Sequence, residues 1–353
     1  MTTPAHIREA EEASAAFQLA LAQIGVETTA EALELWESVN PARLAATAQQ
    51  WLDRAVQLIL TRRRQSRALA MAYYRLARAL RTGRTVADPT LPSPRYVTLE
   101  VLRGEFRALA GVESDLPPDE VVEPSDEPEP EPGEPSEPID EDRVPVEEIE
   151  DLRAEEERRE REAEEEARLV LDALGPANIE RQLEDLGDDR LEELSAREVD
   201  ELREQAHAKA GARQAAAASR VARNGGRDLI KAAGDRDERV LGYVRLSRTG
   251  TPCGWCAMLL SRGFTPKSGP YRSQSSAGPT RQELVAGTAA DVDRYHDNCN
   301  CYAEPVYSRE QLNNSPLFAL NRRYAQEWPR VTRGTSGRDA LSVWRKYIRS
   351  QQD

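Results

Sequence analysis

A long acidic and proline-rich segment is the sequence feature that most constrains how this chain can fold. Residues 113–146 contain nine of the 22 prolines and only six aliphatic side chains. Such a segment cannot bury enough apolar surface to offset the loss of chain entropy, so we expect it to be disordered or polyproline-like. The 353-residue chain is therefore expected to fold as separate parts on either side of it.

The negative charge of the chain is concentrated in the same region. Residues 113–166 hold 26 acidic residues and five arginines, a net charge of −21. The rest of the chain holds 36 acidic and 43 basic residues, a net charge of +7. We interpret the acidic insert as a spacer, flexible at first and then semi-rigid. A mimic of DNA or a tail that binds a scaffold is the alternative.

Residues 1–111 are predicted to form an N-terminal helical domain. Apolar residues near the start, at Phe17, Leu19, Leu21 and Ile24, are spaced as on one face of a helix, and this first helix is expected to stop at Gly25. Residues 42–82 then contain neither proline nor glycine and are rich in alanine, leucine and arginine, which favour helix. They are expected to form one long helix, or two with a short break, ending at Gly83.

The second half of that helical stretch carries eight arginines and no acidic residue between Arg62 and Arg84. One interpretation is a surface for nucleic acid or an acidic partner. Its candidate residues are Arg62, Arg63, Arg64, Arg67, Arg75 and Arg78. The other is a helix face whose arginine stems cover an apolar stripe. The sequence favours the second interpretation, because no base-reading motif is present.

Residues 112–194 are predicted to be the linker. Pro145 suits a helix start, and the glutamates and arginines that follow form pairs four residues apart, with the acid first. These features predict an exposed charged helix that ends near Gly175.

The sequence contains no run of about 18 apolar residues that could span a membrane, so we expect no membrane partner. The N-terminal residues are polar and acidic and lack the apolar stretch that a secretory signal requires, so we expect no secretory signal.

Residues 195–353 are predicted to form a small α+β domain, so the fold class expected for the whole chain is mainly α. A capping box at Ser195 and Glu198 begins a helix that should run to about Asn224 and break at Gly225–Gly226. A second helix and a strand follow. A second strand and two C-terminal helices, the first with a possible break at Pro316, complete this domain.

All four cysteines and one of the three histidines lie within 49 residues of this domain. Cys253 and Cys256 have the C-x-x-C spacing that lets two thiolates face one ion. His296, Cys299 and Cys301 form H-x-x-C-x-C, and the last two share a face if the backbone is extended. We interpret the two half-sites as a structural zinc site with five candidate ligands for four positions.

Three other interpretations of the cysteines stay open. They are reduced thiols packed in a small core, disulfides, and a catalytic cysteine–histidine pair. Four cysteines without a secretory signal indicate a reducing compartment, which disfavours disulfides. A catalytic pair is disfavoured because the cysteines come in pairs, and because the sequence has no nucleophile elbow, zinc-protease motif or phosphate loop. The sequence therefore predicts no enzyme.

The order of these motifs resembles a known family. The stretches GYVRLSRTGTPCGWCAMLLSRG and YHDNCNCYAEPVY are similar to the C-terminal domain of phage Mu F-type minor capsid, or head morphogenesis, proteins, in particular those of phages of actinobacteria. That family has a strand, a C-x-x-C turn, a short helix ending in Arg-Gly, a linker, H-x-x-C-x-C and a strand. The upstream RVARNGGRDLI and the arginine-rich helix are similar to the same group. Asp297 stands where many members have proline.

The resemblance implies a minor capsid protein present in a few copies inside the phage head. Its expected role is procapsid assembly, and its expected partners are the portal protein and the major capsid or scaffold protein. It would reside in the capsid interior, and in the host cytoplasm during assembly. Two alternatives are a capsid maturation protease, a label that some family members carry, and an accessory protein for DNA packaging or ejection that binds DNA through Arg62–Arg84.

Overall fold

A computed structural model describes residues 3–92, 94–111, 143–185, 187, 193–247, 252–267, 297 and 299–351. These residues are mainly helical, with two small sheets, which confirms the predicted fold class. Most of the segment predicted to be disordered, residues 113–142, lies outside the described residues. None of the helices in the described ranges is long and apolar enough to cross a membrane.

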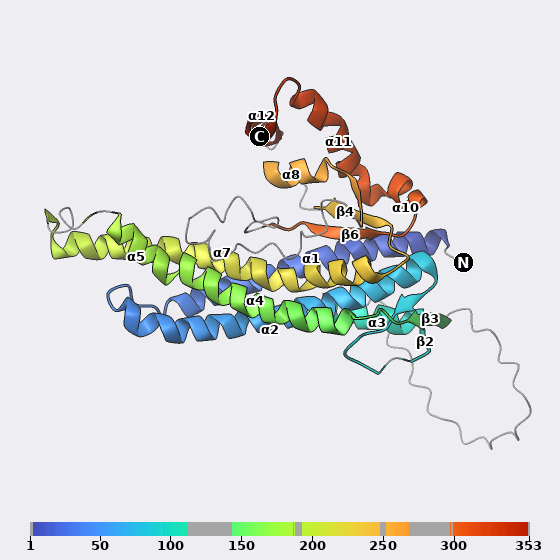
Figure 1. Ribbon diagram of the computed structural model, residues 1–353, viewed down its shortest axis with the longest axis horizontal. Coiled ribbons are helices and arrows are strands. Elements are labelled where there is room, and N and C mark those ends of the chain that lie inside the picture. The colour runs from blue at the N-terminus through green and yellow to red at the C-terminus, as the bar shows by residue number, and fades with distance from the viewer. Residues whose placement is uncertain are drawn as a thin grey trace, which may run out of the picture.

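Four long helices form an elongated bundle (Figure 1). They are α1 (Pro4–Trp36), α2 (Leu44–Thr82), α4 (Leu152–Leu174) and α7 (Ala196–Arg236). Helix α7 packs against the other three, and the short α5 (Pro176–Glu184) packs against α4 and α7. The capping box predicted at Ser195 and Glu198 begins α7, and Gly83 ends α2 in a left-handed conformation. Helices on either side of the predicted boundary at 194/195 thus share one bundle.

Two glycine positions expected to end helices lie inside them instead. Helix α1 continues past Gly25, and α7 runs without a break through Gly225–Gly226. A Cβ atom at Gly25 would lie 2.6 Å from Nε of Arg223, and one at Gly225 would lie 2.7 Å from the carbonyl oxygen of Arg63. The predicted breaks are therefore wrong, because these glycines serve close helix–helix contact, which their sequence pattern does not distinguish from a stop.

A small sheet precedes α4, where the sequence predicted a helix start. Its strands are β1 (Thr85–Val86), β2 (Tyr96–Thr98) and β3 (Arg143–Glu147). β3 pairs in parallel with β1 and antiparallel with β2. Pro145 lies within β3 and α4 begins at Leu152, so the predicted helix start is wrong. Residues 143–146 are likewise not disordered, because two strands from before the insert bind both edges of β3 and Val144 is buried.

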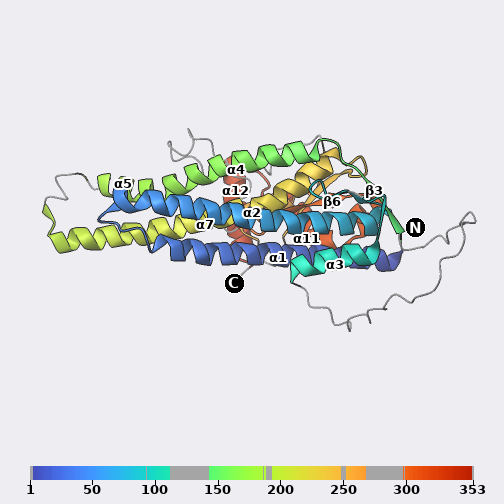
Figure 2. The same cartoon turned by 90° about the horizontal axis from the view of Figure 1, so that it is seen from below.

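Helix α4 ends beside Gly175 as predicted, but it is not a free exposed helix. It lies along α2 and α7 (Figure 2). Ala163, Ala167 and Leu171 on its inner face are buried. Its inward glutamates pair with arginines of the bundle, as for Glu156 with Arg67 at 2.7 Å. The charge pattern predicts the helix correctly but cannot show that arginines elsewhere in the chain attract it to the bundle.

The C-terminal part places a second sheet against the bundle. Its antiparallel strands are β4 (Gly242–Leu246), β5 (Phe264–Pro266) and β6 (Tyr302–Val306), with β4 in the centre. The other helices within the described ranges are α3 (Leu99–Ala110), α8 (Gly254–Leu260), α10 (Arg309–Asn314), the 3-10 turn η3 (Pro316–Phe318), α11 (Ala319–Val331) and α12 (Gly337–Arg349). The predicted C-terminal helices and the break at Pro316 are confirmed.

The sheet and the bundle share one hydrophobic core. Tyr302 of β6 is fully buried against α1, where its hydroxyl lies 2.5 Å from that of Ser14. The same hydroxyl donates to Glu304 at 2.9 Å, and Tyr73 of α2 donates to this carboxylate at 2.6 Å. Phe17 stacks on Tyr73 with ring centroids 4.5 Å apart. These contacts fix the strand that follows the cysteines onto the bundle.

Candidate metal centre

Three of the four cysteines meet in one buried cluster. Cys256 comes from α8, and Cys299 and Cys301 from the segment that leads into β6. Their Sγ atoms all lie within 4.8 Å of one another, and those of Cys256 and Cys299 are 3.4 Å apart. The three side chains are 3%, 2% and 1% exposed. The structure therefore brings together the two half-sites that the sequence separates.

Of the other two candidate ligands, Cys253 and His296, the structure describes only Cys253. Cys253 is exposed and caps the start of α8, where its Sγ accepts a hydrogen bond from the Cys256 N–H at 3.4 Å. His296 lies outside the described residues. None of the four cysteines forms a disulfide in the structure. The arrangement is that of reduced thiols, three of which can act as ligands to one metal ion.

The thiols of the cluster differ in how readily they ionise. The hydrogen bond with Cys253, followed by those with Cys299 and Cys301, raises the pKa of Cys256. The hydrogen bonds with Cys256 and Cys301, together with the nearby positive charge of Arg245, lower the pKa of Cys299. Nη2 of Arg245 lies 3.6 Å from Sγ of Cys299. The positive charge of Arg245 beside its sulfur therefore favours a thiolate at Cys299.

Arginines of α7 hold the cysteine segment in place. Nη1 of Arg223 donates to the carbonyl oxygen of Cys299 at 2.8 Å, and Arg227 donates to the same oxygen. Nε of Arg220 donates to Asp297 at 3.0 Å. Burial and the adjacent Arg227 lower the pKa of Arg223 to about 9. These arginines place positive charge along the side of the cysteine segment that faces α7, which favours thiolate ligands.

The role of these α7 arginines is absent from the sequence-based predictions. Arg220, Arg223 and Arg227 are spaced three and four residues apart, so they lie on one face of a helix. The spacing could have identified a basic face of this helix from the sequence alone. The sequence does not show that this face contacts the cysteine segment.

The predicted nucleic-acid residues of α2 are not gathered at the cysteine cluster. Five of the six form ion pairs with carboxylates elsewhere in the chain. The pairs are Arg62 with Glu27 and Glu31, Arg63 with Glu160 and Asp228, Arg67 with Glu156 and Glu160, Arg75 with Glu105, and Arg78 with Asp237 and Glu147. Arg64 is exposed and donates to Thr61 at 3.2 Å. DNA binding through this helix stays a prediction, and it would require several of these pairs to open.

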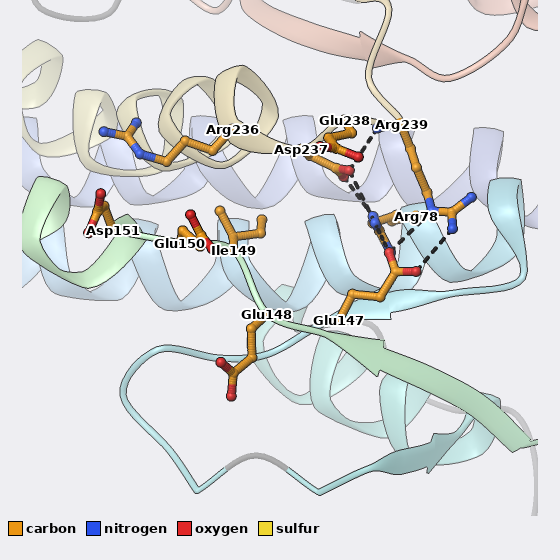
Figure 3. Close-up of a pocket in the computed structure, with 10 residues that line it drawn as sticks. All are labelled: Arg78, Glu147, Glu148, Ile149, Glu150, Asp151, Arg236, Asp237, Glu238 and Arg239. Atoms are coloured by element: carbon orange, nitrogen blue, oxygen red, sulfur yellow. Dashed lines mark hydrogen bonds and ion pairs between the residues drawn. The ribbon is translucent and has the colours of Figure 1, made fainter.

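A cavity of about 770 Å³ lies near the ends of α2 and α7 (Figure 3). Figure 3 shows Arg78 between Asp237 and Glu147, with Arg239 on the other side of Glu147. Nε of Arg78 lies 2.6 Å from Asp237, and Arg239 lies 3.0 Å from Glu147. Much of the charge here is thus paired within the protein. The residues that line this cavity include no serine, threonine, cysteine or histidine, so it offers no nucleophile of these kinds.

A comparison with models of known protein families gives a match to part of the chain. The model of a family described as VG15 protein matches residues 165–327, a range that contains α7, the cysteine cluster and all three strands of the second sheet. VG15 is a phage-associated family, so the match indicates a phage protein. No curated protein matches the chain, and no solved structure matches it.

Proposed function

We propose that this phage protein is a minor capsid protein that acts in procapsid assembly, associated with the portal or the inner capsid surface. The observation that best supports this proposal is the cluster formed by Cys256, Cys299 and Cys301, which lies within the range matched by the VG15 family. Cysteines from the two motifs that resemble those of Mu F-type head proteins thus lie in one cluster. The match to a phage-associated family supports the same role.

We further propose that the cysteine cluster binds zinc as a structural ion. Tetrahedral zinc with Zn–S bonds of about 2.3 Å places its sulfur ligands roughly 3.8 Å apart. The separation of 3.4 Å between Cys256 and Cys299, with all three sulfurs within 4.8 Å, fits this geometry. Four ligands would come from the three clustered cysteines with Cys253 or His296. Zinc here would contribute folding free energy, because it would join α8 to the segment before β6.

The zinc content of the purified full-length chain tests this part of the proposal. We expect about one zinc ion per chain after purification without chelators, measured by inductively coupled plasma mass spectrometry. Cys256→Ser should lose most of the zinc and lower the melting temperature, whereas Ser261→Ala near the end of the same helix should retain it. Less than about half an equivalent in the unaltered chain would contradict a structural zinc site.

The capsid role requires a separate experiment in infected cells. Purified heads should contain the protein in a few copies, and phage that lack its gene should fail to form normal DNA-filled heads. Purified portal protein, major capsid protein and scaffold protein, each tested for co-sedimentation with the full chain, would identify the partner. Absence of the protein from both procapsids and mature heads would contradict the proposed role. An unprocessed major capsid protein in normal particles would eliminate the protease alternative.

A further inference from the structure

Helix α1 carries an exposed apolar stripe along its outer face. Leu19, Val26 and Leu33 lie seven residues apart and are 72%, 63% and 40% exposed. Ala22 and Ala30 lie between them, which gives a spacing of three and four residues along one side of the helix. At 1.5 Å per residue the stripe runs for roughly 21 Å. We define these five residues as the α1 stripe.

The α1 stripe is separate from the face that packs into the core. Phe17, Leu21 and Ile24 on the other side of α1 are buried in the shared hydrophobic core. In Figure 2 α1 lies at one edge of the bundle. Single exposed leucines are common on protein surfaces, but a line with heptad spacing is typical of a helix that packs against another helix.

The charges beside the α1 stripe indicate the chemistry of its partner. Between Glu9 and Trp36, α1 contains six glutamates and neither lysine nor arginine. Glu12 and Glu34 are exposed, and Glu27 beside the stripe remains 39% exposed despite its pair with Arg62. Two copies of α1 packed together would bring carboxylates close to carboxylates, which disfavours self-association.

We propose that the α1 stripe is a docking surface for a basic amphipathic helix of a partner protein. Apolar side chains of that helix, spaced three and four residues apart, would pack over Ala22 and Ala30, between the larger side chains of the stripe. Lysines or arginines along its edges would face Glu12, Glu27 and Glu34. This proposal rests on α1 alone and is independent of the capsid role and of zinc.

A designed peptide tests the proposal with the full-length chain. The probe is a fluorescein-labelled helical peptide of about 20 residues with leucine and alanine at heptad positions and lysines beside them. Controls are the same peptide with glutamates in place of the lysines, and a scrambled lysine peptide. Fluorescence anisotropy should show that the lysine peptide binds more tightly than both controls, and that added salt weakens its binding.

Variants of the chain then locate the binding. Leu19→Gln, Val26→Gln and Leu33→Gln combined should weaken binding of the lysine peptide by at least about tenfold. Leu91→Gln with Leu241→Gln, at positions 59% and 45% exposed, should leave it unchanged. Val26→Gln alone serves as the test if the triple variant melts early. Equal binding by the stripe variant, or equal binding of the glutamate peptide, would overturn the proposal. Dimerisation of the unaltered chain that the stripe variant loses would instead identify a second copy as the occupant.

Discussion

Replacing Arg63 with alanine tests whether the arginine run of α2 acts inside the fold or on its surface. Arg63 is 1% exposed. Its guanidinium donates to Glu160 at 3.0 and 3.2 Å, to the carbonyl oxygen of Val221 at 2.9 Å and to Asp228 at 3.2 Å. One arginine thus joins α2 to both α4 and α7. Alanine would leave Asp228 and a carbonyl group buried with fewer partners.

The size of the effect follows from these contacts. Removing one partner of a buried ion pair costs about 3–5 kcal/mol, and we expect a loss in this range. The loss should depend on pH, because burial raises the pKa of Asp228 to about 6 even with Arg63 present. Without Arg63 the pKa of Asp228 should rise further in the folded chain. The free energy of unfolding of the variant should then keep falling as the pH rises above 6, because a buried and unpaired carboxylate disfavours the folded state. The difference from the unaltered chain should therefore be larger at pH 8 than at pH 5.

Urea denaturation followed by far-ultraviolet circular dichroism measures this difference. Arg64→Ala is the matched control, because Arg64 is adjacent and exposed, and it should change the free energy of unfolding by no more than about 0.5 kcal/mol. A loss for Arg63→Ala as small as that for Arg64→Ala would refute the structural role. Salt-sensitive DNA binding that Arg63→Ala removes without unfolding the chain would support the nucleic-acid interpretation instead.

Two further predictions concern packing and charge. Gly225→Ala should destabilise the chain by roughly 1–3 kcal/mol because its Cβ would overlap the backbone of α2, whereas Gly104→Ala on α3, with no atom within 4 Å, should stabilise it by about 0.5–1 kcal/mol. Thermal melts of both variants check the pair, and equal effects would contradict the close contact. Hydrogen bonds from Arg239 and then Arg78 lower the pKa of Glu147 to about 2, so its stabilisation is present above about pH 4.5 and is lost as the pH falls toward 2. Since the carboxylate is 30% exposed, Glu147→Gln should cost only about 1 kcal/mol at pH 7, and urea denaturation should show this cost shrinking below pH 4.5.

Local patterns in the sequence predict where helices begin and end better than they predict which helices contact one another. The capping box at Ser195, the helix end at Gly83 and the break at Pro316 depend on neighbouring residues, and the structure has all three. The partners of Arg63 lie 97 and 165 residues away in the sequence, so no local pattern identifies them. Gly225–Gly226 has the same appearance in a sequence whether it ends a helix or lets another helix approach. Only the position of α2 distinguishes these cases.

The cysteine cluster shows how local and distant information combine in one site. Spacing alone predicts that Cys299 and Cys301 act together and that Cys253 and Cys256 form a turn. Spacing cannot predict what holds the two halves at the right separation, since that depends on α7. Arginines on one face of α7 bind the segment around Cys299, and Tyr302 immediately after the cluster is buried against α1. The bundle therefore positions one half of the site, and α8 places Cys256 beside it, with its Sγ 3.4 Å from that of Cys299. The bundle and the second sheet share one hydrophobic core, so contacts with the bundle hold the cysteine segment in place.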